Sequence, residues 1–497
     1  MKRIIFGVLA SVFAVTALLA VAMRVSADDA PTVATNRLVN PPGLIDANNS
    51  PTIARSPRSP GTVVVTHRVD RPRFSARLEW SADEGRTWKS TALPLPAGLD
   101  RPFAPDAAFA PDGTLYITYV NLTGSGNVPA NLWLATSSDG GRTLSAPVRI
   151  AGKLAFQARV AVDDEGVAHV IWLQAPEVGL LALAGPPSPV VAAHSTDGGR
   201  TFSRPQRVSD PARELVGAAS PVIDADGQLA VLYEDFKDDR RDFQNLDGPP
   251  WEEPFGLVLT RRLDSGSFAA GVEFERGVVP TRRFLPFLPE FPSLAAGPDD
   301  VLYAAWADGR NGDEDVFLRR SVDDGRSWST ATRVNDNPKG DGTSQYLPRV
   351  DVAPDGRVDV IYLDRRRDRG DVMTDATLAS SDDEGASFEN VRLSSRSFDS
   401  RVGASASQRL PVDFGSRLGL ASGSDRSLAT WTDTRLGTAD TGRQDVFFAA
   451  YETASLPGFA RAPVIAVLIA LALAFGALTA SGRRADASAG RGLPEAD

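Results

Sequence analysis

The sequence predicts an all-β protein, a β-propeller of seven blades, with six blades as the alternative count. One short turn motif recurs along most of the 497 residues, and four short apolar segments surround each copy. Gly and Pro, at 43 and 36 residues, are frequent enough to end many short strands. Four antiparallel strands in a unit of about 50 to 70 residues are typical of a propeller blade.

The recurring turn follows the pattern Ser-x-Asp-x-Gly-x-Thr/Ser, usually with an aromatic residue next. An Asp side chain bonds backbone amides of its own turn, and Gly accepts a positive φ, so the motif is first a folding device. Five clear copies and one degenerate copy occupy residues 81–88, 137–144, 195–202, 321–328, 380–388 and 263–268.

Strands follow one order around each turn. A Pro-led apolar strand such as 51–54 precedes an aromatic-rich strand such as 114–120. A third strand such as 315–321 then enters the Asp turn, and a fourth such as 330–336 leaves it. The units begin near Pro51, Asp106, Gln157, Pro221, Pro292, Pro348 and Pro411.

The last unit lacks a fourth strand after its third, residues 444–452. The pattern of the missing strand recurs at the other end of the chain, since residues 35–40 (TNRLVN) resemble residues 331–336 (ATRVND). We therefore expect the N-terminal strand to complete the last blade, which closes the ring and removes an exposed sheet edge.

Two apolar segments predict export and anchoring. Residues 1–27 have the charged start, apolar run and small-residue end of a signal peptide, with an uncleaved anchor as the alternative. Residues 462–480 carry no charge and are long enough to cross a bilayer as a helix. Arg483 and Arg484 follow, which places the tail in the cytoplasm. The expected parts of this single-pass cell-membrane protein are a signal peptide (1–27), a propeller ectodomain (28–458), a transmembrane helix (459–482) and a cytoplasmic tail (483–497).

Composition excludes several kinds of site. The chain has no Cys, and its three histidines, His67, His169 and His194, lie far apart in sequence. Thiolate nucleophiles, Cys-ligated metals and a Ser-His-Asp triad are therefore not expected. The formal net charge of −10 argues against a nucleic-acid partner, and no cofactor is predicted.

The repeated turns resemble the Asp-box (BNR) repeats of the sialidase (neuraminidase) superfamily, over nearly the whole expected ectodomain. The resemblance implies a six-bladed exo-sialidase with an arginine triad for the substrate carboxylate, a Tyr nucleophile paired with Glu, and an Asp acid/base. The first family arginine lies in a [FY]-R-I-P motif, where this chain has SPTIARSPR (50–58). Asp boxes also occur in propellers with other glycosidase activities or with none.

Strand alternation places the Asp boxes on the rim of the first-to-second turns, so we look for function on the rim of the second-to-third loops. Three loops there share an aromatic residue followed by Asp-x-Arg. These pairs either bridge to each other and order the loop, or present their arginines to an anionic ligand. A third interpretation is calcium binding at Asp308, Asp313 and Asp315. The candidate ligand-binding residues are Asp308, Arg310, Asp364, Arg366, Asp433 and Arg435.

The longest loops, 234–256 and 281–291, mix charged and aromatic residues that suit either sugar binding or loop packing. The apolar loop 177–191 suits contact with a partner or the membrane surface. For glycosidic chemistry the candidates are Glu234, Asp235 and Tyr346. The sequence thus predicts a membrane-anchored, extracellular, sialidase-like propeller that acts on or binds a glycan or other small polar ligand; if it is an enzyme, it is a glycoside hydrolase of the exo-sialidase type. The alternative is a non-catalytic binding or assembly propeller at the cell surface.

Overall fold

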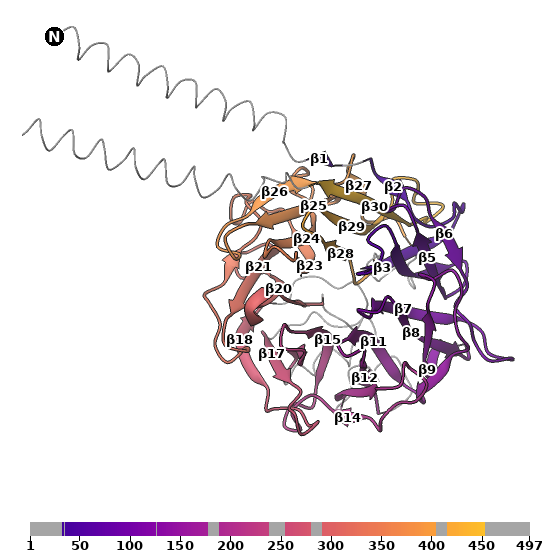
Figure 1. The fold of residues 1–497 in the computed structure, drawn as a ribbon. Helices are drawn as coiled ribbons and strands as arrows, with labels where there is room; N and C mark the ends of the chain where they lie inside the picture. The colour runs from indigo at the N-terminus through magenta and orange to yellow at the C-terminus, as the bar shows by residue number, and fades with distance from the viewer. Residues whose placement is uncertain are drawn as a thin grey trace, which may run out of the picture. The chain divides into compact units, whose positions relative to one another are not determined.

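The computed structural model describes residues 32–33, 35–125, 127–176, 188–237, 254–279, 291–403 and 415–452. Residues Val33–Tyr451 form one compact unit, a ring of seven sheets around a central axis (Figure 1). The second unit, Met1–Thr32 with Glu452–Asp497, lies outside the described residues except at Thr32 and Glu452. The all-β, seven-bladed propeller is confirmed, and the six-bladed alternative is not.

Each of blades 1 to 6 is an antiparallel meander whose strands lie in chain order from the axis outward, and blade 7 follows this order for its first three strands. The first strands of blades 1 to 7 are β3 (Ala47–Arg55), β7 (Pro102–Phe109), β11 (Ala155–Val162), β15 (Val216–Ile223), β19 (Ser293–Ala296), β23 (Gln345–Val352) and β28 (Gly419–Ser422). The second strands are β4 (Val63–Arg71), β8 (Leu115–Thr123), β12 (Ala168–Gln174), β16 (Leu229–Asp235), β20 (Leu302–Asp308), β24 (Val358–Asp364) and β29 (Arg426–Asp433).

The third strands are β5 (Ser75–Ser81), β9 (Val128–Ser137), β13 (Val190–Ser195), β17 (Phe255–Arg261), β21 (Asp315–Ser321), β25 (Met373–Ser381) and β30 (Asp445–Glu452). The fourth strands of blades 1 to 6 are β6 (Lys89–Thr91), β10 (Val148–Ala151), β14 (Gln206–Arg207), β18 (Val272–Val278), β22 (Thr332–Arg333) and β26 (Glu389–Arg392). Three short strands and one 3₁₀ turn are the remaining described elements: β1 (Thr32–Val33), β2 (Arg37–Leu38), β27 (Phe398–Asp399) and η3 (Pro298–Asp300).

The predicted closure of the ring is confirmed. Strand β2 pairs antiparallel with β30, with Arg37 opposite Phe448. The Val39 amide donates to the Val446 carbonyl at 2.9 Å. Asn40 extends the junction, because its side chain accepts from the Val446 amide at 2.7 Å and donates to Asp445 at 3.0 Å. Blade 7 therefore joins the two ends of the ring by hydrogen bonds.

Apolar side chains fill the spaces between neighbouring blades. Strand alternation gives each sheet two apolar faces, so each core cluster draws on two adjacent blades. Trp306 of blade 5 lies fully buried against blade 4, and Trp431 of blade 7 against blade 6. This packing holds the seven sheets as one body.

The Asp boxes lie at the third-to-fourth turns, as predicted. In blade 5 the Asp323 carboxylate accepts from the Ser327 amide at 2.8 Å and from the Ser321 hydroxyl at 2.9 Å. Gly325 has a φ of 79° and donates its amide to the Ser321 hydroxyl at 2.8 Å. The degenerate copy at 263–268 is the turn between β17 and β18.

The predicted starts of the units fall up to a few residues from the observed strands. Pro51 and Gln157 lie inside β3 and β11, because each first strand begins before its sequence signal. Pro292 directly precedes β19, and Pro411 lies outside the described residues. The predicted signal peptide and transmembrane helix also lie outside them. Within the described ranges, no helix has the length and apolar character needed to cross a membrane.

Candidate functional site: an arginine-lined axial cavity

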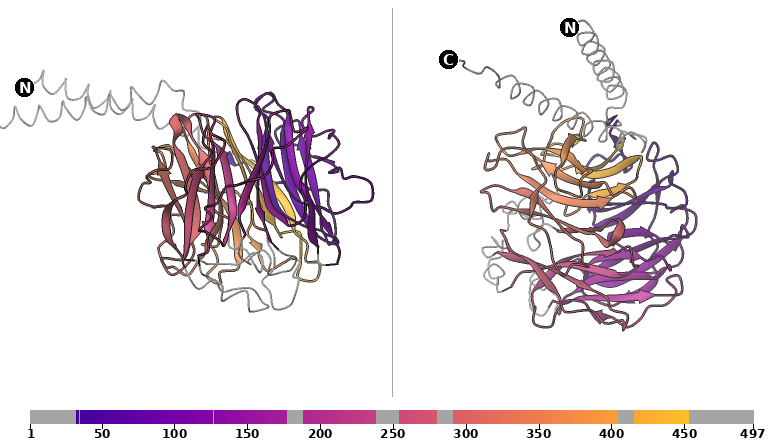
Figure 2. Two further views of the ribbon diagram at one scale, coloured as in Figure 1. Left: turned by 90° about the horizontal axis from the view of Figure 1, so that it is seen from below. Right: turned by 60° about the vertical axis from the view of Figure 1, so that its left-hand side comes forward.

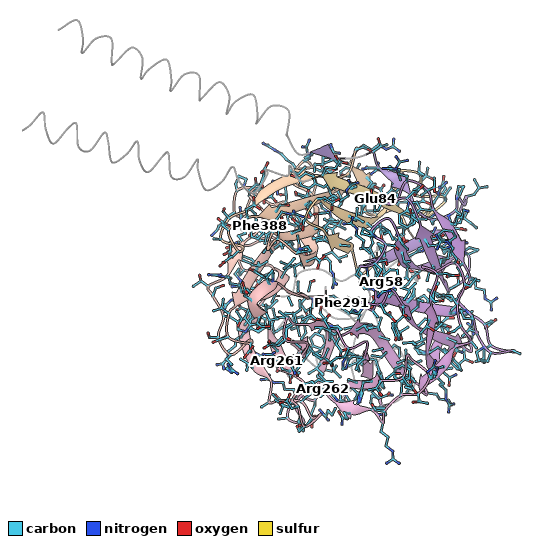
Figure 3. The ribbon with its side chains drawn as sticks, viewed as in Figure 1. Arg58, Glu84, Arg261, Arg262, Phe291 and Phe388 are labelled. Carbon is cyan, nitrogen blue, oxygen red and sulfur yellow. The ribbon has the colours of Figure 1, made fainter. Side chains whose placement is uncertain are left out.

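A cavity of about 600 Å³ lies on the axis of the ring. All seven blades line it through their first strands or first-to-second turns. Figure 3 shows side chains converging from the whole ring, with the turn residue Arg58 near its middle. Each first strand is the inner edge of its sheet, and the lining includes the charged side chains of Asp106, Arg159, Arg349 and Asp351. The cavity therefore suits a hydrophilic ligand.

A repeated β-bulge places particular side chains in one layer of the axis. The pairing of first and second strands shifts directly before Asp106, Arg159 and Arg349, and equally before Thr52 and Ser220. A bulge re-aims the side chain that follows it. The equivalent register of these strands explains how residues far apart in sequence meet at the axis.

Three guanidinium groups gather at this layer around one shared carboxylate. Arg159 Nε lies 3.6 Å from Asp106 Oδ2, and Arg417 Nη1 lies 3.9 Å from Asp106 Oδ1. Asp106 Oδ2 also accepts the Val160 amide at 3.0 Å. Arg349 lines the cavity and makes no hydrogen bond or ion pair with the described residues. Arg159 keeps Nη1 buried without a hydrogen-bond partner among the described residues.

The electrostatics of the cluster show a shortage of negative charge. Burial, and then the charge of Arg159, lower the pKa of Arg349 to about 10 and that of Arg417 to about 9. Burial raises the pKa of Asp351, which also lines the cavity, to about 6. Asp351 Oδ2 accepts the Ser422 amide at 2.7 Å. Three arginines thus face two carboxylates, Asp106 and Asp351, and a bound anion would balance the remaining positive charge.

The three predicted Asp-x-Arg pairs lie elsewhere. Each arginine bonds to its own aspartate; Arg435 Nε donates to Asp433 Oδ2 at 2.9 Å and Arg310 Nε to Asp308 Oδ2 at 2.8 Å. The Arg366 amide donates to Asp364 at 3.0 Å. None of these residues lines the axial cavity.

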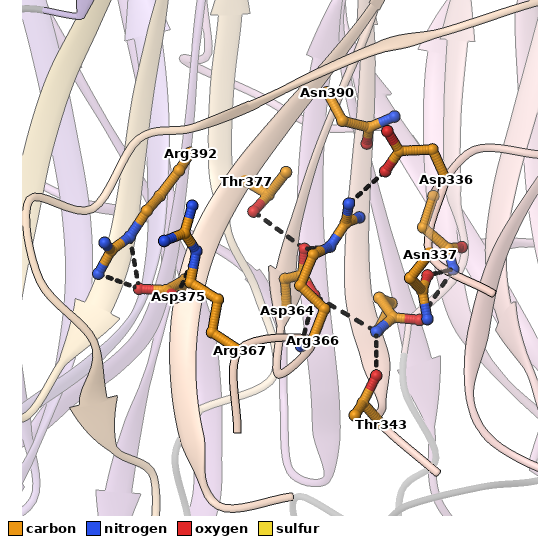
Figure 4. Close-up of polar contacts among 12 residues, drawn as sticks. Asp336, Asn337, Thr343, Asp364, Arg366, Arg367, Asp375, Thr377, Asn390 and Arg392 are labelled. Atoms are coloured by element: carbon orange, nitrogen blue, oxygen red, sulfur yellow. Dashed lines mark hydrogen bonds and ion pairs between the residues drawn. The ribbon is translucent and has the colours of Figure 1, made fainter. Parts of the chain in front are cut away.

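Each of these arginines also reaches the outer part of the preceding blade. Arg310 lies 3.5 Å from Glu275 of β18, and Arg435 donates to Ser395 at 2.8 Å. Arg366 of blade 6 donates to Asp336, which follows β22 of blade 5 (Figure 4). We call these contacts the Asp-Arg latches, because they join neighbouring blades. They favour the loop-ordering interpretation, and a role in ligand binding stays a prediction.

The aromatic residue of the pattern belongs to the latch. Trp306 Nε1 donates to Asp308 at 3.2 Å, and Trp431 Nε1 to Asp433 at 2.9 Å. In blade 6 the tyrosine that replaces tryptophan, Tyr362, accepts from Arg366 at 2.8 Å. The repeated aromatic-x-Asp-x-Arg sequence is therefore a hydrogen-bonded unit.

The predicted catalytic candidates do not come together. Glu234 is buried in blade 4, its Oε2 has no hydrogen-bond partner in the part of the chain that the structure describes, and burial raises its pKa well above the usual range. Asp235 pairs with Arg213. Tyr346 is fully buried in blade 6, where its hydroxyl accepts from Arg365 at 3.0 Å. None of the three lines the cavity, and their catalytic roles stay predictions.

The proposed calcium ligands already have protein partners. Asp315 lies 3.1 Å from Arg333, and Asp313 accepts the Gly342 amide at 2.9 Å. In the part of the chain that the structure describes, no three His, Cys, Asp or Glu side chains gather as a metal ion would require. Much of the long loops lies outside that part: residues 177–187, 238–253 and 280–290.

The axial residues Asp106, Arg159, Arg349 and Arg417 are not among the site residues predicted from the sequence. A signal was present, because Asp106, Arg159 and Arg349 are charged residues that each follow a Pro or Ala at the same point of a first strand. The cavity also reaches the first-to-second turns, which share a rim with the Asp boxes, whereas the Asp-x-Arg repeats pointed to the opposite rim.

Comparisons with known proteins find only remote likeness in structure. No protein-family model and no curated protein matches the chain. A protein of unknown function from Dyadobacter fermentans is 12% identical with a TM-score of 0.47, over 85% of this chain and 99% of that one. The endosialidase of phage phi92 is 12% identical with a TM-score of 0.47, over 86% and 70%. The Hadza microbial sialidase Hz136 is 18% identical with a TM-score of 0.43, over 64% and 63%.

Proposed function

We propose that this protein binds the acidic group of a glycan in its axial cavity. The observation that carries the proposal is the excess of guanidinium charge where Arg159, Arg349 and Arg417 approach Asp106. Arginine presents a planar fork of donors that matches a carboxylate.

Binding is better supported than hydrolysis. The described residues that line the cavity include no Tyr and no Glu, so they lack the nucleophile pair that the resemblance implies. One observation favours a second candidate function, hydrolysis of the exo-sialidase type. Asp351 lines the cavity with a pKa of about 6. A carboxyl group that is partly protonated near neutral pH is suited to donate a proton to a leaving-group oxygen.

The proposal includes display outside the cell. The signal-like residues 1–27 and the uncharged segment 462–480 support an exported propeller with one membrane-spanning helix and a cytoplasmic tail. A protease-protection experiment on intact cells tests this. Cleavage of the propeller and protection of a tag after Asp497 are expected, and a protected propeller would contradict the topology.

Binding is tested by calorimetry on the full chain in a neutral detergent. Galacturonic acid and N-acetylneuraminic acid are the probes, and their methyl esters are the uncharged controls. Arg349→Gln should weaken binding of the acids by about 2–5 kcal/mol, while Arg310→Gln in an Asp-Arg latch should leave it unchanged. Equal binding of acids and esters, or an unaffected Arg349→Gln variant, would contradict the proposal.

Hydrolysis is tested separately with a fluorogenic sialoside. If Asp351 is the proton donor, Asp351→Asn should abolish release of the fluorophore and keep binding of N-acetylneuraminic acid. Absence of release by the unaltered chain would remove the second candidate and leave the binding proposal standing.

A further inference from the structure

The mouth of the axial cavity carries a charge opposite to its interior. The blade strands run along the ring axis in the side view of Figure 2, so their turns gather at two rims. Three of the turn residues that line the cavity, Ala225, Pro298 and Pro354, are exposed to solvent. The cavity therefore opens at the rim of the first-to-second turns.

An exposed aspartate occupies this turn in each of blades 2 to 7. The members of this acidic ring are Asp112, Asp164, Asp226, Asp299, Asp355 and Asp425. Some have a folding role; Asp112, for example, accepts the Thr114 amide at 2.8 Å. Only the turn of blade 1 differs, since it carries Arg58. Asp164, Asp226 and Asp299 form no ion pair with the described residues, so their charge faces solvent.

Hydrogen bonds between turns hold parts of the ring in place. The Asp226 amide of blade 4 donates to Asp300 of blade 5 at 3.0 Å. Arg357 of blade 6 donates to the Gly423 carbonyl of blade 7 at 2.8 Å. Arg55 of blade 1 lies 3.3 Å from Asp425. A fixed mouth keeps its negative charges at a set distance from an entering ligand.

We infer that the ligand enters through this mouth, and that the acidic ring admits one acidic group on an uncharged body and rejects polyanions. The inference rests on the proposed function, because the arginine cluster is its end point. A single carboxylate gains more binding free energy at the arginines than it loses through electrostatic repulsion while it passes the ring. Each further acidic group remains at the ring, where like charges repel it within the screening length of about 8 Å.

The route is tested with single cysteines, because the chain has none of its own. Ala225→Cys lies at the mouth, and Leu436→Cys, which is 46% exposed, lies in a second-to-third loop as the matched control. After coupling to a polyethylene-glycol maleimide, the first variant should lose binding of galacturonic acid and the second should keep it. Loss of binding only after labelling at Leu436→Cys would overturn the inferred route and leave the proposed function intact.

The charge selection is tested with a matched series of galactose, galacturonic acid and trigalacturonic acid. The unaltered chain should bind galacturonic acid most tightly. Asp226→Asn combined with Asp355→Asn should raise the association rate of trigalacturonic acid by roughly tenfold or more. Equal or tighter binding of trigalacturonic acid by the unaltered chain would overturn the selection.

A further readout needs no bound sugar. Val352→Cys places a thiol inside the cavity, where a negatively charged methanethiosulfonate should react faster once Asp226 and Asp355 are neutralised. An unchanged rate would overturn the acidic-ring selection even if no sugar acid bound. If no sugar acid bound while the thiol reacted at the expected rates, the proposed function would be wrong and the acidic-ring selection would stand.

Discussion

Arg159 of blade 3 and Asp106 of blade 2 lie with Nε and Oδ2 3.6 Å apart at the ring axis, although they come from the first strands of two different blades. Equivalent bulges in two first strands bring them together, and Arg417 of blade 7 reaches the same carboxylate. The relationship explains why the cluster is short of negative charge, since one carboxylate serves two guanidinium groups.

Closure of the ring by β2 predicts a global effect of a local deletion. Removing residues 28–42 takes away the strand that pairs with β30 and the Asn40 contacts. We expect the melting temperature of the whole propeller to fall in one cooperative transition, measured by calorimetry. An unchanged melting temperature would contradict the role of β2. Asn40→Ala alone should cost about 1–3 kcal/mol, because it leaves the buried Val446 amide without its acceptor and removes one donor to Asp445.

The Asp boxes should act on stability alone. Asp323→Ala removes the acceptor of the Ser327 amide and hydroxyl, and we expect a loss of about 0.5–2 kcal/mol by analogy with capping side chains. Hydrogen bonds from Ser327 lower the pKa of Asp323, so its contribution is present above the unfolded pKa of about 4 and is lost as pH falls through the lower folded value. Denaturant titrations at several pH values measure this. Binding of galacturonic acid by the folded variant should not change.

The latch of blade 7 is more buried than the sequence suggested. As partly exposed pairs they would contribute at most about 1 kcal/mol, but the Arg435 and Asp433 side chains are 6% and 0% exposed. Arg435→Ala leaves a buried carboxylate without its cation, so we expect a loss of about 3–5 kcal/mol. Ligand affinity, measured well below the melting temperature, should be unchanged. A stable variant that no longer binds sugar acids would instead revive Arg435 as a ligand residue.

Binding of an anion should depend on pH through Asp351. Burial raises its pKa to about 6, and the groups facing it include Arg349, Asp359 and the Ser422 amide. As pH falls from 7 to 5, Asp351 gains a proton and the cavity loses a negative charge. Affinity for galacturonic acid should then rise by about tenfold. In Asp351→Asn the affinity should be high throughout this range.

The same titration has a consequence for stability. A carboxyl group with a raised folded pKa favours folding at low pH, and this contribution disappears as pH rises through about 6. Asp351→Asn should therefore be more stable than the unaltered chain above pH 6. The two should converge below the unfolded pKa of about 4. If the free energies of unfolding of Asp351→Asn and the unaltered chain changed in parallel with pH, Asp351 would not titrate as described.

Much of the fold was predictable because local chemistry repeats. Each Asp box marks a third-to-fourth turn by itself, and the TNRLVN segment identified β2 by its likeness to other fourth strands. The site was less predictable, because its members meet only after the ring closes. Arg349 follows a Pro at a bulge that points it at the axis, whereas an aspartate holds Arg366 in a latch, and neither arrangement can be recognised before the other blades are in place.

Binding of an acidic sugar in the axial cavity can be seen in a crystal structure of the protein soaked with galacturonic acid. We expect the carboxylate beside the guanidinium groups of Arg159, Arg349 and Arg417, with the sugar ring directed toward the turns that contain Ala225 and Pro354. Density for the sugar at the loops of Arg310, Arg366 and Arg435, with an empty axial cavity, would contradict it.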